Sequence, residues 1–125
     1  MPNKVFLNSD NIQEIIIEGD QHIEAFKAAM EESARLDEET KVRGIPLKSL
    51  VDISKMGELD RQVIYEALHN IINRDYVKSA IYGHYETHNP IVNFFLKDME
   101  HISNHRMRVF DDRTEALKWL RDEIN

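Results

Sequence analysis

Short β-rich runs alternate along this chain with longer segments whose apolar residues repeat at helical spacing, and this alternation limits the folds open to it. The clearest helical stripe begins after Gly57 and the second follows the Asn89–Pro90 pair, a typical helix start. Their apolar positions are Val63, Ile64, Ala67, Leu68, Ile71 and Ile72 in the first, and Ile91, Val92, Phe95, Leu96, Met99 and Ile102 in the second. Two such stripes predict amphipathic helices that cover a sheet.

The other segments complete an alternating order of strands and helices. We predict strands at residues 4–7, 12–18, 47–53, 77–82 and 107–110, with a turn at 8–11 that makes the first two a hairpin. A first helix carries Ile23, Phe26, Met30 and Ala34 on one face and ends in the polar stretch 37–43, and a last helix follows Asp112. Strands that alternate with helices favour parallel neighbours joined by right-handed crossovers. The predicted fold is a single α/β domain over residues 1–125, with a mixed sheet covered by about four helices.

Glycines and helix caps set the predicted element ends. Gly19 and Asp20 are expected to end the second strand, with Asp20 as the N-cap of the first helix. Gly57 is expected to end the third strand in the same way. Asp112 and Glu115 have the spacing of a capping box at the last helix.

The composition limits the cellular compartment and the classes of partner that we expect. The chain has 125 residues and no cysteine, which excludes disulfides, thiolate metal sites and a cysteine nucleophile and is typical of a reducing cytoplasm. The apolar run within residues 1–7 is too short for a signal peptide, and no run is long enough for stable membrane insertion. The net charge of −7 disfavours nucleic acid and anionic membrane as partners. We therefore expect a soluble cytoplasmic protein.

Particular runs of residues resemble a known family. These are Leu50, Val51, Asp52, Ile53, Ser54, Met56, Leu59 and Asp60; Asn93, Phe94, Phe95 and Leu96; and Val109, Phe110, Asp111, Asp112, Glu115, Ala116, Leu117, Trp119 and Leu120. Together they are similar to the STAS or SpoIIAA-like family over roughly residues 47–120, and most resemble small stand-alone members. These motifs are structural, so they indicate a fold rather than an activity.

The resemblance implies a βα sandwich that acts by binding other proteins, best known in anti-sigma-factor antagonists switched by serine phosphorylation. In those proteins an Asp, two small hydroxyl residues and a Gly open the second helix. Here Asp60 is followed by Arg61, Gln62 and Val63, so the phosphorylatable serine is missing. Some SpoIIAA-like proteins are also compared with lipid-binding CRAL-TRIO domains, which leaves a small apolar ligand open.

In a sheet of this kind ligands tend to bind outside the carboxyl ends of the parallel strands. Loops after the third, fourth and fifth strands are expected to meet there, at residues 54–56, 84–89 and 111–113. Phe94 and Phe95 cannot both face the core of one helix, so Phe94 or Tyr85 is expected at the surface. The candidate ligand or partner surface consists of Ser54, Lys55, Met56, Asp60, His84, Tyr85, Glu86, His88, Asn89 and Phe94.

Two groups of residues that include histidines give weaker hypotheses of metal binding. His84, Glu86 and His88 alternate and resemble a zinc or iron set, but solvated loop residues are the simpler interpretation, because alternation lacks the spacing of a metal motif. His101 and His105 lie four apart and carry the same weak metal hypothesis. We predict no catalytic residue, metal or cofactor.

Three functional hypotheses follow, in this order. The first is a non-enzymatic regulatory module that binds a protein partner or itself, including homodimerisation through the Phe94 or Tyr85 surface. The second is a carrier or sensor of a small apolar or anionic molecule, held between the third helix and the sheet. An enzyme that uses the histidine-rich loop ranks last, because nothing supplies both a nucleophile and an oriented base.

Overall fold

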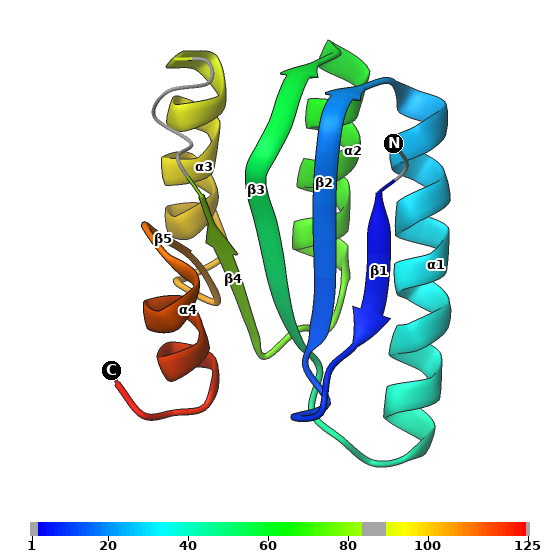
Figure 1. Ribbon diagram of the computed structural model, residues 1–125, viewed down its shortest axis with the longest axis vertical. Helices are drawn as coiled ribbons and strands as arrows, with labels where there is room; N and C mark the ends of the chain where they lie inside the picture. Colours follow the sequence, from blue (N-terminus) through cyan, green and yellow to red (C-terminus); the bar gives the residue numbers. More distant parts are fainter. Residues whose placement is uncertain (1–2, 84–89, 125) are drawn as a thin grey trace.

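The computed structural model describes residues 3–83 and 90–124, and these form one mixed sheet with helices on both faces (Figure 1). The elements, in chain order, are β1 (Lys4–Leu7), β2 (Gln13–Gln21), α1 (Ile23–Val42), β3 (Lys48–Leu59), α2 (Arg61–Asn73), β4 (Lys78–Tyr82), α3 (Pro90–Ile102), β5 (Met107–Phe110) and α4 (Arg113–Leu120). The strands lie side by side in the order β1-β2-β3-β4-β5. β1 runs antiparallel to β2, and the remaining pairs are parallel. The predicted hairpin, mixed sheet and four helices are confirmed.

The two faces of the sheet have separate cores. Val51 and Ile53 of β3 face a core completed by α1, α2 and α3, whereas Leu50 faces the opposite way and packs with Trp119 of α4. This division follows from the strand geometry, in which successive side chains point to opposite faces. One row across the sheet joins Gln13, Ser49, Ser79 and Met107, and it lies on the face covered by α1, α2 and α3.

β2 and β3 run farther than predicted. β2 continues through Gly19 and Asp20, so the N-cap of α1 is His22, and the Asp20 carboxylate accepts a hydrogen bond from the Glu58 N–H at 2.9 Å. β3 continues through Gly57, where a Cβ would overlap Asp20 Oδ1 and lie 3.0 Å from the Asp20 nitrogen. The prediction that these glycines end the strands was wrong. At Gly57 the missing side chain lets two paired strands approach closely instead.

The longer β3 changes the position of a predicted loop. Residues 54–56 lie within the strand, not after it, with Ser54 and Lys55 exposed and Met56 buried. β3 thus continues to Leu59, directly before the N-cap of α2 at Asp60.

The C-terminal elements match the predictions closely. α3 begins at Pro90, and β5 has the predicted ends. Asp112 caps α4 by accepting a hydrogen bond from the Glu115 N–H at 2.9 Å, as the capping spacing indicated. None of the helices in residues 3–83 and 90–124 has the length and apolarity needed to cross a membrane.

The inward face of α1 is more polar than its apolar stripe predicted. Ala34 is exposed, whereas Ser33, Asp37 and Thr40 are buried at successive turns of the same face. Thr40 satisfies its hydroxyl by donating to the Leu36 carbonyl at 2.8 Å, which leaves Ser33 and Asp37 to find partners outside the helix.

Candidate functional site

An apolar cavity of about 130 Å³ lies between the sheet and the helices α1, α2 and α3, which cover one of its faces. Among the described side chains, its wall comes from β2, α1, β3, α2, β4, α3, β5 and the segment between α2 and β4. The residues are Ile15, Ile17, Phe26, Met30, Ser49, Val51, Ile53, Met56, Leu59, Val63, Ala67, Asn70, Arg74, Tyr76, Ser79, Ile81, Leu96 and Met107. Val63, Ala67 and Asn70 line the cavity from α2, Arg74 from the C-cap of that helix, and Leu96 from α3.

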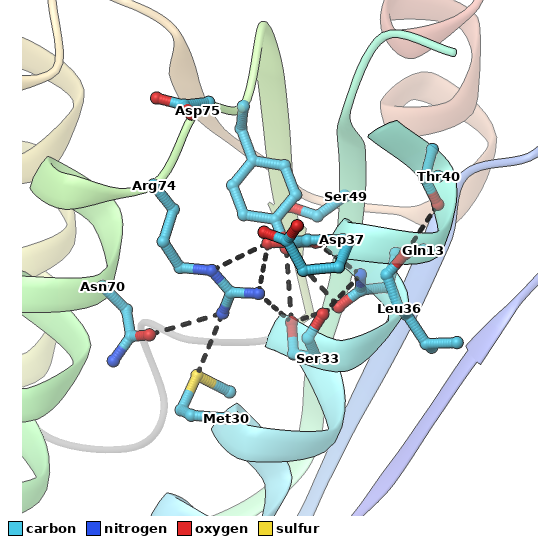
Figure 2. A network of polar contacts seen from close by, with 12 residues as sticks. Gln13, Met30, Ser33, Leu36, Asp37, Thr40, Ser49, Asn70, Arg74 and Asp75 are labelled. Carbon is cyan, nitrogen blue, oxygen red and sulfur yellow. Dashed lines mark hydrogen bonds and ion pairs between the residues drawn. The ribbon is translucent and has the colours of Figure 1, made fainter. Parts of the chain in front are cut away.

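Five polar residues form a cluster beside the cavity: Gln13, Ser33, Asp37, Arg74 and Tyr76. The first four are labelled in Figure 2. Asp37 lies at its centre. Its Oδ2 accepts from Arg74 Nε at 3.0 Å and Nη2 at 2.5 Å. Its Oδ1 accepts from Gln13 Nε2 and from the Tyr76 hydroxyl, each at 2.9 Å. The cluster thereby joins β2, α1 and the segment between α2 and β4.

The Arg74 guanidinium is fully occupied. Besides Asp37, its Nη2 donates to Ser33 Oγ at 2.8 Å. Its Nη1 donates to Asn70 Oδ1 at 3.3 Å and lies 3.9 Å from Met30 Sδ (Figure 2). These five contacts match the five N–H donors of a guanidinium.

Because the cluster is buried, its two charged side chains depend on their ion pair. The Arg74 and Asp37 side chains are only 14% and 7% exposed, so each needs the other's charge. Burial raises the pKa of Tyr76 well above its ordinary value, and the phenol therefore stays protonated and can donate to Asp37. Nearby, the hydroxyls of Ser49 and Ser79 bond to each other at 2.7 Å.

The arrangement favours binding over chemistry. Ser33 donates its hydroxyl hydrogen to Gln13 Oε1, and an amide oxygen is not a base that activates a nucleophile. The cluster holds a positive and a negative charge that cancel, and the rest of the wall is largely apolar. A site with these properties can enclose an apolar molecule.

No known protein-family model matches this chain, and no curated protein sequence does. In three dimensions the chain is similar to an uncharacterised protein of the DUF3478 family from Shewanella loihica PV-4, which has a SpoIIAA-like fold. The similarity has a TM-score of 0.62 and covers 94% of this chain and 91% of that one, at 17% sequence identity. The chain has a SpoIIAA-like fold. At this identity the likeness confirms the predicted fold and carries no information about activity.

The described residues of the predicted partner surface differ in their exposure. Ser54 and Lys55 are exposed on β3, whereas Met56 is 7% exposed and forms part of the cavity wall. Asp60 is the N-cap of α2, and its Oδ2 lies 3.2 Å from His22 Nδ1. Phe94 is 73% exposed on α3, which confirms that one of the two predicted aromatics is at the surface.

The predicted histidine-rich loop, His84, Tyr85, Glu86, His88 and Asn89, lies outside the described residues. The rings of His101 and His105 pack edge to face, with centroids 6.5 Å apart. Within residues 3–83 and 90–124, no three His, Asp or Glu side chains come together as metal ligands would.

Two residues of the third predicted loop, residues 111–113, make contacts within the fold. Asp112 caps α4, and Arg113 binds the buried Glu14 carboxylate through both terminal nitrogens, at 2.6 and 2.8 Å. This contact attaches the start of α4 to β2 on the face of the sheet that α4 covers.

The polar cluster was not predicted from the sequence. The signal was present in the first helix, where Ser33, Asp37 and Thr40 continue the inward face that Phe26 begins. Polar residues at core positions of a helix indicate buried partners, because an unpaired buried charge is strongly destabilising. Their partners, however, come from distant segments and could not be assigned from spacing.

Proposed function

We propose that this protein binds a small apolar molecule inside the cavity, as a carrier or a sensor. The observation that carries the proposal is the cavity of about 130 Å³ with its largely apolar wall. An engineered apolar cavity of about 150 Å³ in another protein stays dry and binds benzene. A single ring or a short alkyl chain therefore matches the size of this site.

Energetics support the same proposal. At about 24 cal/mol per Å³, an enclosed and empty space of this volume would cost about 3 kcal/mol relative to a filled core. That is a large fraction of the 5–15 kcal/mol that typically stabilises a domain. A ligand that fills the space would recover part of this free energy, which gives the folded protein an affinity for apolar molecules.

The polar cluster supports the site by fixing one side of it. Arg74 follows the last turn of α2, and its ion pair with Asp37 attaches that end of the helix to α1. Buried charges that need each other resist displacement. The pair thus hinders α2 from moving inward to fill the space between Ala67 and the sheet.

Methionine methyl groups give a direct test. Met30, Met56 and Met107 line the cavity, whereas Met99 is buried in the same core but does not line it. In protein labelled with ¹³C at the methionine methyl groups, benzene should shift the first three NMR signals saturably and Met99 much less. If saturating benzene leaves the three lining signals unchanged, the proposal is wrong.

Two alanine-to-leucine substitutions, one in the cavity wall and one at the surface, test where benzene binds. Ala67 lines the cavity from α2, so Ala67→Leu should fill part of it and weaken benzene binding at least about tenfold. Ala28→Leu makes the same change at an exposed position of α1 and should leave binding unchanged. Equal benzene affinity in both variants would place the ligand elsewhere. Native mass spectrometry of freshly purified protein would show whether a cellular ligand is retained.

A second candidate function is contact with another copy of this chain. Phe94 and Ile102, 73% and 51% exposed, place apolar area on the outer surface of α3, and Ser54, Lys55 and Asp60 of the expected partner surface are exposed too. Light scattering over a wide concentration range should show a dimer that Phe94→Ser weakens. A monomer at every concentration would exclude self-association and direct the search to other proteins by pull-down.

A further inference from the structure

We infer that the molecule taken up by the cavity is uncharged, and that the Arg74–Asp37 ion pair enforces this selectivity. The inference rests on the proposed function and names the class of ligand for the same site. It separates two ligand classes that the sequence leaves open, apolar and anionic.

An anion would need a free positive donor, and the cluster offers none. Arg74 is the cation in the described cavity wall. All five of its N–H directions point at protein acceptors, namely Asp37 twice, Ser33, Asn70 and the sulfur of Met30. A carboxylate that took the place of Asp37 would leave that buried charge unpaired, and one that took the place of Asn70 or Met30 would have to share the guanidinium with Asp37.

A cation meets the same obstacle at Asp37. An ionised carboxylate has about four acceptor sites, and Asp37 has four contacts, two on each oxygen. The Ser49 and Ser79 hydroxyls are bonded to each other, which uses one of their two hydrogens, and they add no charge. Among the described residues, both charged groups beside the cavity are therefore already paired within the protein.

A charged ligand would also lose its hydration without compensation when it entered an apolar space. The free-energy penalty for an unpaired ion is large enough that we expect discrimination of at least about 100-fold against a charged ligand of equal shape. The neutral ligand loses little hydration and gains the contacts of the wall.

Nitrobenzene and benzoate are a suitable pair of probes, because they have the same shape and differ in charge at neutral pH. Each is titrated into wild-type protein while the methyl signals of Met30, Met56 and Met107 are followed. The expected result is saturable shifts with nitrobenzene and none with benzoate at a 100-fold higher concentration. Equal binding of the two would overturn the inference but leave the proposed function intact. If neither these probes nor benzene shift the signals, the proposed function itself fails.

Asp37→Asn tests whether the ion pair is the cause. The amide removes the charge that occupies Arg74, so benzoate binding should rise at least about tenfold relative to wild type. Asp75→Asn is the control, because Asp75 is exposed and its Oδ2 pairs with Lys41 at 3.1 Å, outside the cluster. A folded Asp37→Asn variant that still excludes benzoate would overturn the role given to the ion pair. If that variant does not fold, the wild-type comparison still decides whether a charged ligand is excluded.

Discussion

Arg74 Nε and Nη2 both donate to a single oxygen of Asp37, Oδ2, at 3.0 and 2.5 Å. The two residues lie 37 positions apart, one on α1 and the other at the C-cap of α2. Their contact leaves Oδ1 of Asp37 free to accept from Gln13 and Tyr76. One carboxylate therefore organises contacts to two neighbouring elements, and several measurable properties depend on it.

Removal of Asp37 should be strongly destabilising. Asp37→Ala leaves the buried Arg74 charge without its partner, and the expected loss is about 3–5 kcal/mol of unfolding free energy. Glu39→Ala removes an exposed ion pair with Arg35 on the same helix and should cost less than about 1 kcal/mol. Urea unfolding of both variants measures the difference. Similar losses in the two variants would contradict the importance of burial at Asp37.

Tyr76 should make the protein sensitive to alkaline pH. Its pKa is raised by burial in the folded state, whereas in the unfolded chain it ionises near its ordinary value of about 10. Above that value the unfolded state loses a proton that the folded state keeps, so the unfolding free energy falls as pH rises, by up to about 1.4 kcal/mol per pH unit. Stability measured from about pH 8 to about pH 11 should decline less in Tyr76→Phe than in wild type.

At pH 8, in contrast, wild type should be the more stable of the two proteins. Tyr76→Phe removes a hydrogen bond to Asp37 and should be about 1–2 kcal/mol less stable than wild type there. The two stability curves should therefore converge as pH rises. Parallel curves would show that Tyr76 titrates equally in the folded and unfolded states.

Glu14 should confer stability that is lost in acid. The hydrogen bonds from Arg113 hold its pKa below the ordinary value, although the side chain is buried. This contribution is present above the ordinary carboxyl range and disappears as pH falls through the lowered folded-state pKa. Glu14→Gln should cost about 1.5–3 kcal/mol near neutral pH and progressively less in acid.

Asp10→Asn provides the control for this acid dependence. Asp10 pairs with Arg121 at 2.7 Å, but both side chains are well exposed. The substitution should change the unfolding free energy by less than about 1 kcal/mol at every pH. A pH-independent cost of Glu14→Gln would mean that packing, not charge, accounts for its effect.

Gly57 should tolerate no side chain while Asp20 is present. Gly57→Ala would place its Cβ against Asp20 Oδ1 and 3.0 Å from the backbone of Gly19 and Asp20, at an expected cost of about 1–3 kcal/mol. In an Asp20→Ala background the side-chain overlap is gone, so the same change should cost less. Thermal and urea unfolding of the double-mutant cycle measures this coupling. Equal costs in the two backgrounds would argue against the overlap.

The fold was largely predictable because its signals are local. The repeat of Val63 and Ala67, the Asn89–Pro90 pair and the Asp112 cap each act within a few residues, and α2, α3 and α4 lie where these signals indicated. The predictions that strands end at Gly19 and Gly57 were wrong because the deciding contact is not local. A glycine that breaks a strand and a glycine that lets two strands approach have the same local sequence, and Asp20 distinguishes them only after β2 and β3 are paired.

The sequence by itself determined the order of the elements, the two faces of the sheet and the absence of thiol chemistry, since periodicity and composition are properties of the chain alone. Only the tertiary structure decided that α1, α2 and β2 bring Asp37, Arg74 and Gln13 together beside an unfilled apolar space. The physical reason is that a cavity and a buried ion pair depend on how closely distant elements pack, and that distance is set by all the side chains between them.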